Sequence, residues 1–217
     1  MALAILHSRA LCGMHASPVT VEVHLANGLP SFTIVGLAEA EVKEARDRVR
    51  AALQNARFDF PARHITVNLA PADLPKESGR FDLPIAVGIL VATGQLPGDA
   101  LERYEFAGEL ALGGTLRPVR GALAMSLGAQ RAGRAFVLPA ENAPEAALVE
   151  DATIYAARDL LQVCAHLHGS ERLVRYADPP PEVAGIYADI QDVKGQAQPK
   201  RALEIAAAGA HLSLIHI

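Results

Sequence analysis

The chain has 217 residues, of which 51% are hydrophobic and 20% charged, so it can bury a full core and is too apolar for an intrinsically disordered protein. Its formal net charge of −4 at pH 7 gives no general excess of positive charge, so a nucleic-acid contact would need a local basic patch or parts of a longer protein. No apolar run approaches the roughly 18 residues of a transmembrane helix, and Cys12 and Cys164 lie far apart without a CxxC pattern. We therefore expect a cytoplasmic protein with no membrane contact and with both cysteines as buried thiols.

Residues 1–36 are predicted to form a β-ribbon. Residues 1–15 lack the basic start and long apolar stretch of a secretory signal and are interpreted as a strand. Residues 19–25 alternate apolar and polar side chains, the turn sequence NGLP at 27–30 interrupts them, and the β pattern resumes at 32–35.

An amphipathic helix is predicted from Glu39 to Asn55, because apolar residues recur there at steps of three and four while charged residues fill the other face. Two pairs on this helix, Glu39 with Lys43 and Glu44 with Arg48, have the favourable i,i+4 order of opposite charges.

Short strands and helices are predicted to mix through the rest of the first domain. A buried helix from Leu83 to Thr93 has Pro84 in its first turn, and Asp82 is expected to be its N-cap. The other predicted elements are strands at 64–69, 105–110, 135–138 and 152–156, helices at 122–131, 144–149 and 160–168, and a polar loop at 70–81. This mixture indicates an α/β (α+β) fold.

The sequence DPPPE at residues 178–182 predicts a proline-stiffened linker. We divide the chain into a first domain at 1–175, a linker at 176–188 and the incomplete start of a second domain at 189–217. In that last part a helix is predicted from Pro199 to Ala208, with the proline in its first turn.

Four long blocks resemble one known family. They are VEVHLANGLPSFTIVGL at 21–37, VKEARDRVRAALQN at 42–55, ITVNLAPADLPKESGRFDLPIAVGIL at 65–90, and DVKGQ with KRALEIAAAGAH between 192 and 211. In this order they are similar to the N-terminal portion of the ComM/YifB family of magnesium-chelatase-like AAA+ ATPases, over nearly the whole chain.

The resemblance implies a Lon-protease-like first domain followed by a AAA+ module that uses ATP and Mg²⁺ and assembles as a homo-oligomeric ring, usually a hexamer. It also implies that the longer protein is an ATP-driven DNA helicase or branch-migration factor in natural transformation. The family name refers to a related chelatase subunit and implies no metal site in this chain.

Val193, Lys194, Gly195 and Gln196 resemble the segment of a AAA+ module that contacts the adenine ring. A glycine lets the backbone approach the base, although the same residues without the resemblance would be an ordinary helix entry. The family continues into a strand and the phosphate-binding loop GxxxxGK[ST], which does not occur in these 217 residues. Ser213, His216 and Ile217 depart from that strand pattern, so the tail is interpreted as foreign sequence or a fragment artefact. We therefore expect the fragment itself to bind no cofactor and to hydrolyse no ATP.

A Lon-type peptidase is a less favoured alternative. Its serine would fall at Asp82 and its lysine near Leu123, and neither residue can act as nucleophile or base. Ser78 and Lys76 lie two positions apart in one loop and do not reproduce a dyad from separate elements. We expect no catalytic residue, and the loop 70–82 is interpreted as a solvated segment that caps the following helix.

A stand-alone DNA- or protein-binding module is the other alternative. Lys43, Arg46, Arg50 and Arg57 could form a basic stripe, but neighbouring acidic residues dilute it and favour a solvated or subunit-contact face.

His166 and His168 are two residues apart on a predicted helix and so point to different faces. We therefore interpret them as surface residues and not as metal ligands.

Overall fold

The computed structural model describes residues 3–13, 15–36, 40–177 and 189–209. The chain divides into two units, Met1–Asp178 and Pro179–Ile217. None of the helices in the described ranges is long and apolar enough to cross a membrane.

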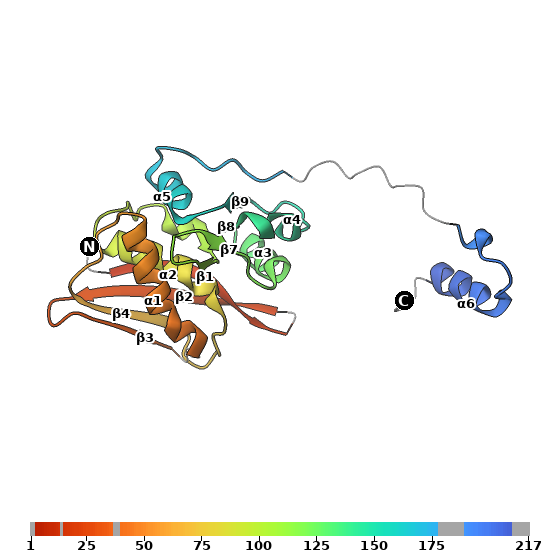
Figure 1. Cartoon of the computed structure of the whole chain (residues 1–217), viewed down its shortest axis with the longest axis horizontal. Helices are drawn as coiled ribbons and strands as arrows, with labels where there is room; N and C mark the ends of the chain where they lie inside the picture. The colour runs from red at the N-terminus through yellow and green to blue at the C-terminus, as the bar shows by residue number, and fades with distance from the viewer. Residues whose placement is uncertain (1–2, 14, 37–39, 178–188, 210–217) are drawn as a thin grey trace. The chain divides into compact units, whose positions relative to one another are not determined.

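A four-stranded sheet in the order β1-β2-β4-β3 begins unit 1 (Figure 1). Its strands are β1 (Leu3–Cys12), β2 (His15–Ala26), β3 (Ser31–Val35) and β4 (His64–Ala70). The first two form the predicted β-ribbon, with Leu3 opposite His24 and Cys12 opposite His15. Strand β2 also pairs antiparallel with β4, whereas β3 and β4 are parallel.

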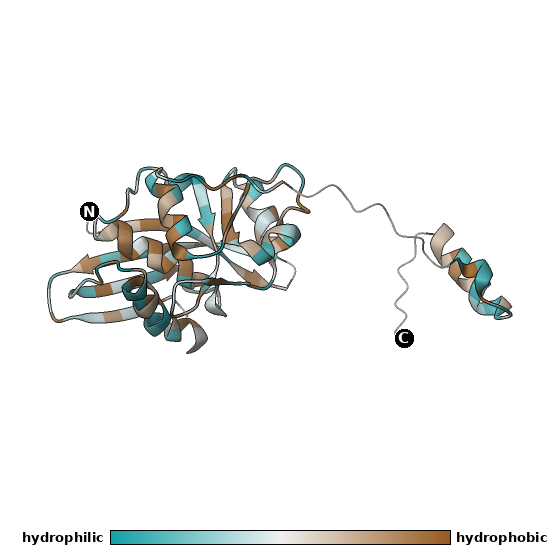
Figure 2. Ribbon diagram, turned by 45° about the horizontal axis from the view of Figure 1, so that its top comes forward, coloured by the Kyte–Doolittle hydropathy of each residue, from teal (hydrophilic) through white to brown (hydrophobic). Residues whose placement is uncertain are grey.

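Two helices, α1 (Ala40–Asn55) and α2 (Asp82–Ala92), contact each other. Alternate β2 residues from Val19 to Leu25 are buried, as expected for a strand with one face on a core. All residues of α2 are buried, and Gly88 lets it approach β2, because a Cβ there would lie 2.5 Å from Val23 Cγ2. Figure 2 shows hydrophobic residues concentrated in the interior of unit 1.

A parallel three-stranded sheet, in the order β5-β8-β9, lies in the second half of unit 1, together with a two-stranded β6–β7 pair. Its elements are β5 (Tyr104–Phe106), β6 (Glu109–Leu110), β7 (Leu116–Arg117), α3 (Ala122–Arg131), β8 (Ala135–Pro139), α4 (Ala143–Ala146), β9 (Ile154–Ala157) and α5 (Leu160–His168). Buried residues of α3, β8 and α4 form a second hydrophobic core beside the larger first one.

A buried ion pair joins the first sheet to the second. Arg9 of β1 contacts Glu105 of β5 through two hydrogen bonds, at 2.6 Å and 2.8 Å, and donates a third to Ala16 O at 2.9 Å. Arg134 contacts the same carboxylate at 3.4 Å. Arg9 and Glu105 are both buried. The positive charges of Arg9 and Arg134 offset the cost of burying the Glu105 carboxylate.

Several of the predicted strands and helices have different bounds in the structure. The strand expected at 105–110 is two strands in different sheets, because Ala107 N–H donates to Val137 O while Gly108 N–H donates to Arg80 O. Helix α4 ends at Ala146 and not at residue 149, and β9 begins at Ile154. The Glu44–Arg48 contact is present at 3.8 Å, whereas the Glu39–Lys43 pair lies outside the described side chains.

Two predictions about buried and exposed residues were wrong. Cys12 is exposed near the hairpin tip, while Cys164 is buried as expected. His166 is buried and not on the surface, because α5 packs it against Tyr104 and Tyr155, with ring centroids 5.4 Å and 4.7 Å away. His168 is exposed.

Unit 2 contains a short 3₁₀ turn, Ile190–Asp192, and the helix α6 (Ala197–Ala208). The helix begins two residues before the predicted Pro199, so the proline is still in the first turn, where its missing N–H breaks no hydrogen bond. None of the α6 side chains is buried.

Candidate functional site

The carboxylate of Asp82, at the start of α2, accepts hydrogen bonds from two other elements. Arg48 of α1 donates from Nε to Asp82 Oδ2 at 2.7 Å and from Nη2 to Oδ1 at 3.1 Å. The backbone N–H of Leu110 donates to Oδ2 at 3.1 Å. Asp82 therefore connects α1, α2 and β6, and its side chain is fully buried.

Asp82 is not the N-cap that was predicted. Phe81 occupies the N-cap position without a side-chain hydrogen bond, and Asp82 is the first residue of the helix itself. The carboxylate turns towards Arg48, 34 residues earlier in the sequence, and so does not accept from the amides of its own helix. Its negative charge in the first turn still suits the positive end of the helix dipole.

Burial raises the pKa of Asp82 to about 6, against the opposing effects of the Arg48 hydrogen bond, the Arg48 charge and the Leu110 amide. The same hydrogen bond to Asp82 raises the pKa of Arg48 above its usual value. The hydrogen bond between the two side chains therefore favours the charged form of Arg48. Burial of the Asp82 carboxylate away from water favours the protonated form of Asp82.

Two other polar residues of the loop, Lys76 and Ser78, also have partners inside the protein. Lys76 is buried, its Nζ donates to Pro71 O, and burial lowers its pKa against the opposing charge of Asp73. Ser78 Oγ accepts a hydrogen bond from Arg80 Nε at 3.0 Å.

The loop is therefore solvated only in part: Asp73 and Glu77 are exposed, as expected for a solvated segment, whereas Lys76 and residues 79–82 are buried. Arg80 is buried and reaches Met125 of α3, with 3.8 Å between Nη1 and the sulfur. Burial lowers the pKa of Arg80. Glycine at position 79 lets the loop pack closely against Glu109, because a Cβ there would lie 2.6 Å from Glu109 Cγ.

The arrangement provides no peptidase dyad at the expected positions. Asp82 is in an ion pair, and Leu123 is a partly exposed residue of α3 whose N–H donates to Glu145. Ser78 and Lys76 have different partners, so the lysine is not placed to accept the serine proton.

Two aromatic rings lie beside α1, near the arginines that were considered as a basic stripe. The guanidinium of Arg50 lies 4.8 Å from the centre of the Phe60 ring, and Phe60 lies 6.1 Å from Phe32. A hollow of about 230 Å³ is lined by Phe32, Arg46, Asp47 and Arg50. Sequence reasoning missed Phe32 and Phe60 because they come from other segments of the chain.

Two other members of that stripe add little to this hollow. Arg57 is exposed in a left-handed backbone conformation with a φ of 63°, and it is not among the residues that line the hollow. The side chain of Lys43 lies outside the described residues.

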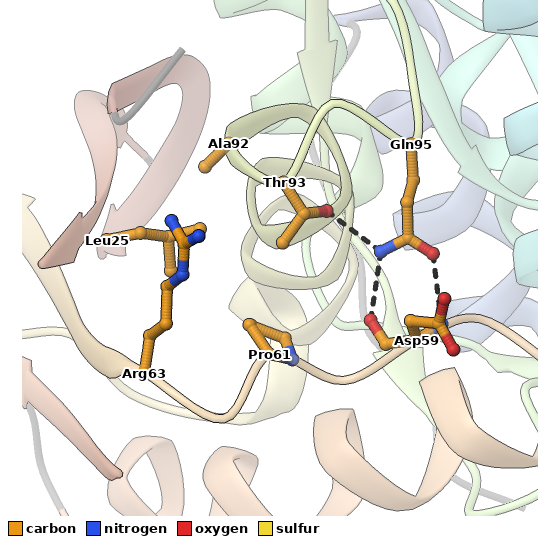
Figure 3. Close-up of a pocket in the computed structure, with 7 residues that line it drawn as sticks. All are labelled: Leu25, Asp59, Pro61, Arg63, Ala92, Thr93 and Gln95. Carbon is orange, nitrogen blue, oxygen red and sulfur yellow. Dashed lines mark hydrogen bonds between the residues drawn. The ribbon is translucent and has the colours of Figure 1, made fainter. Parts of the chain in front are cut away.

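A separate pocket of about 430 Å³ lies beside the end of α2 (Figure 3). Gln95 Nε2 donates to Asp59 O and to Thr93 Oγ1, and Gln95 Oε1 accepts from the Asp59 N–H. Figure 3 shows Arg63 across the pocket from Gln95. These hydrogen bonds hold the turn after α2 in place. The pocket was not predicted, because its lining residues form no recognisable motif in the sequence.

The residues predicted to contact adenine form an exposed turn in unit 2. Val193 is 47% exposed, and Gly195 and Gln196 have left-handed φ angles of 69° and 56°. No atom would contact a Cβ at Gly195, so the backbone there is open to a ligand. The turn ends where Lys200 N–H donates to Gln196 O, at the start of α6.

His166 is fixed by hydrogen bonds and so is not available as a ligand. Its Nδ1 accepts from the Leu173 N–H at 3.0 Å, and its Nε2 lies 3.1 Å from the Tyr104 hydroxyl. Within the described ranges, His, Cys, Asp and Glu side chains do not gather in groups of three that could hold a metal ion.

Comparison with known proteins gives two matches to family models. Residues 21–142 match the model described as subunit ChlI of Mg-chelatase, and residues 189–216 match magnesium chelatase, subunit ChlI. The first match covers most of unit 1 and includes the Asp82 cluster, and the second includes the turn at 193–196.

Curated relatives align with nearly the whole chain. Competence protein ComM of Haemophilus influenzae is 53% identical over 216 residues, which cover 97% of this chain. Uncharacterized proteins named YifB, from Salmonella typhimurium and Escherichia coli, are 52% and 48% identical and cover 99% of it. The chain spans 42% of the length of each of these relatives. It therefore belongs to the ChlI magnesium-chelatase family, as a counterpart of the N-terminal region of YifB and ComM.

Proposed function

We propose that this chain is the N-terminal part of an ATP-driven, DNA-processing AAA+ protein, in which unit 1 is a non-catalytic Lon-like domain and residues 189–217 begin the motor. The observation that carries the proposal is the order of the two family matches, 21–142 and then 189–216, in a chain that spans 42% of its relatives. One of those relatives is named a competence protein.

The exposed turn at 193–196 supports the assignment of the adenine contact. Val193 offers apolar surface and Gly195 offers an open backbone, as contact with a flat base requires. ATP and Mg²⁺ would bind the longer protein, where the phosphate-binding loop supplies amide groups and a lysine for the phosphates. The residues of this chain would contribute the base contact alone.

Two proteins of different length test this proposal. We expect the 217-residue chain to show no ATP hydrolysis, and the gene product that extends beyond it to hydrolyse ATP and to separate branched DNA. In the longer protein, Val193→Asp should weaken the binding of a fluorescent ATP analogue, whereas Ile205→Asp on the exposed α6 is the matched control. ATP hydrolysis by the 217 residues alone, or none by the longer protein, would contradict the proposal.

DNA binding by unit 1 itself is a second candidate function, favoured by the Arg50–Phe60–Phe32 cluster. Aromatic rings with arginine beside them are typical of surfaces on which single-stranded bases stack. Fluorescence anisotropy with a labelled single-stranded oligonucleotide tests it: Arg50→Glu should weaken binding and Arg57→Glu should change it less. Equal losses from both variants would indicate only a general charge effect.

A further inference from the structure

A pocket of about 720 Å³, here called the β1 pocket, lies between β1 and the segment that follows α2. Strand β1 contributes Leu3, Ile5 and His7 to its lining, and the rest comes mainly from residues 94–102. Strand β1 is at the edge of the four-stranded sheet, so in the described part of the chain only β2 pairs with it. The volume of the pocket is in the range of about 300–1,000 Å³ that is usual for small-molecule sites.

The buried residues that line the β1 pocket are apolar. Val91, Leu96 and Leu101 are all buried. Leu3 and Ile5 line the same pocket and are 42% and 45% exposed, although both are large apolar residues. Because apolar surface gains free energy when it is removed from water, the pocket favours a ligand with an apolar body.

The β1 pocket also carries negative charge. Asp99 and Glu102 line it and are exposed, and within the described residues neither side chain forms a salt bridge. The described lining residues include no lysine or arginine. Arg134 donates from Nε to the backbone oxygen of Glu102 at 3.0 Å, but its guanidinium contacts the Glu105 carboxylate. A positively charged group in the pocket would therefore be attracted by two carboxylates.

His7 adds a hydrogen-bonding group to the lining of the β1 pocket. Burial lowers the pKa of His7 and the charge of Arg134 acts in the same direction, against the opposing charges of Glu105 and Glu102. The uncharged imidazole therefore predominates at neutral pH. One ring nitrogen of an uncharged imidazole accepts hydrogen bonds, so His7 can accept one from an amine of a ligand.

We propose that the β1 pocket binds a small organic molecule that combines an apolar body with a positively charged amine. The apolar body would contact Val91, Leu96 and Leu101, and the amine would lie beside Asp99 and Glu102. A nucleotide or another polyanion is disfavoured, because the two carboxylates would repel its phosphates. The inference goes beyond the proposed function, because binding to this pocket requires neither ATP hydrolysis nor the turn at 193–196.

Three naphthalene compounds that differ mainly in the charge of their end group test the proposal. At pH 7.5, 1-naphthylmethylamine is positive, 1-naphthalenemethanol is neutral and 1-naphthoate is negative. Each compound is titrated into the ¹⁵N-labelled 217-residue chain, and the shifts of the backbone amide signals give both the Kd and the place of binding. The amine should bind roughly fivefold more tightly than the alcohol, the factor for two unit charges about 4 Å apart in water. The naphthoate should bind most weakly, and the signals of β1 and of residues 94–102 should shift.

Two variants separate the charge from the apolar surface. Asp99→Asn with Glu102→Gln removes both charges and keeps the side-chain shapes, so the preference for the amine over the alcohol should disappear while the alcohol still binds. Ile5→Thr replaces part of an exposed apolar side chain and keeps its β-branching, so it should weaken the binding of all three compounds to a similar degree. The matched control, Glu141→Gln with Glu150→Gln, removes two exposed charges elsewhere in unit 1 and should bind like the wild type.

Circular dichroism establishes that each variant is folded. The proposal would be overturned by a wild-type chain that does not bind the amine, by naphthoate binding as tight as that of the amine, or by amide shifts that lie away from β1 and residues 94–102. A preference for the amine that survives Asp99→Asn with Glu102→Gln would overturn it as well. So would loss of binding at high protein concentration, which would show that a second copy covers the pocket, or loss of binding in the longer protein, whose further residues would then cover it.

Discussion

Replacing the buried carboxylate of Asp82 should change how the stability of unit 1 depends on pH. The proposed substitution is Asp82→Asn, which keeps the shape of the side chain and removes its titration. Asparagine can still accept a hydrogen bond from Arg48 or from the Leu110 N–H through its amide oxygen. The charge of the carboxylate is therefore the main difference between the two proteins.

The sign and the size of the effect follow from the raised pKa. Burial moves the pKa of Asp82 from 3.8 to about 6, so folding favours the protonated form. The resulting contribution to stability is fully present below pH 3.8 and is lost as the pH rises through about 6. At 1.36 kcal/mol per pKa unit, it amounts to about 3 kcal/mol in full and to about 1.4 kcal/mol between pH 7.5 and pH 5.

Urea unfolding of the wild type and the variant at several pH values, followed by circular dichroism, measures the effect. The free energy of unfolding of the wild type should rise relative to that of Asp82→Asn by about 1.4 kcal/mol when the pH falls from 7.5 to 5. Arg48→Gln should make this rise larger, because it removes the strongest influence that lowers the pKa. A relative loss of wild-type stability over the same range would refute the reasoning and place the pKa below 3.8.

Three further predictions concern the second half of unit 1. Gly128→Ala should cost about 1–3 kcal/mol in thermal unfolding, because its Cβ would lie 2.5 Å from the guanidinium of Arg9, whereas Gly113→Ala in open space should be close to neutral. Glu105→Gln should cost about 3–5 kcal/mol in urea unfolding, since it leaves the buried Arg9 without its counter-charge; an effect below 1 kcal/mol would mean that water reaches the pair. Burial lowers the pKa of His166, so its contribution is present above pH 6.5 and is lost at lower pH; relative to His166→Phe, the wild type should lose stability from pH 7.5 to 5.5, and a gain would contradict this.

Local patterns predicted most elements of the fold. The three- and four-residue periodicity of 39–55 gave α1, and the alternation at 19–25 gave β2, because both elements bury one face on the first core. The helix after residue 82 was also predicted, since its uninterrupted apolar sequence requires burial on all sides. These elements depend on residues that are close together in the sequence.

The failed predictions concern contacts between distant residues. Asp82 was expected to cap its own helix, but an arginine 34 positions earlier forms an ion pair with it. His166 was expected on the surface, but Tyr104 and Tyr155 pack around it from two strands. A helix wheel shows which face of α5 carries the histidine, but it does not show that two aromatic strands lie against that face.

The same long-range contacts indicate which residues of unit 1 are available for function. The ion pairs at Asp82 and Glu105 are buried and connect separate elements, so these groups fix how the elements pack and are not exposed to solvent. Exposed polar side chains of unit 1 lie elsewhere, for example at Arg46 and Arg50 on α1. A partner molecule can reach these exposed side chains without disturbing the buried ion pairs.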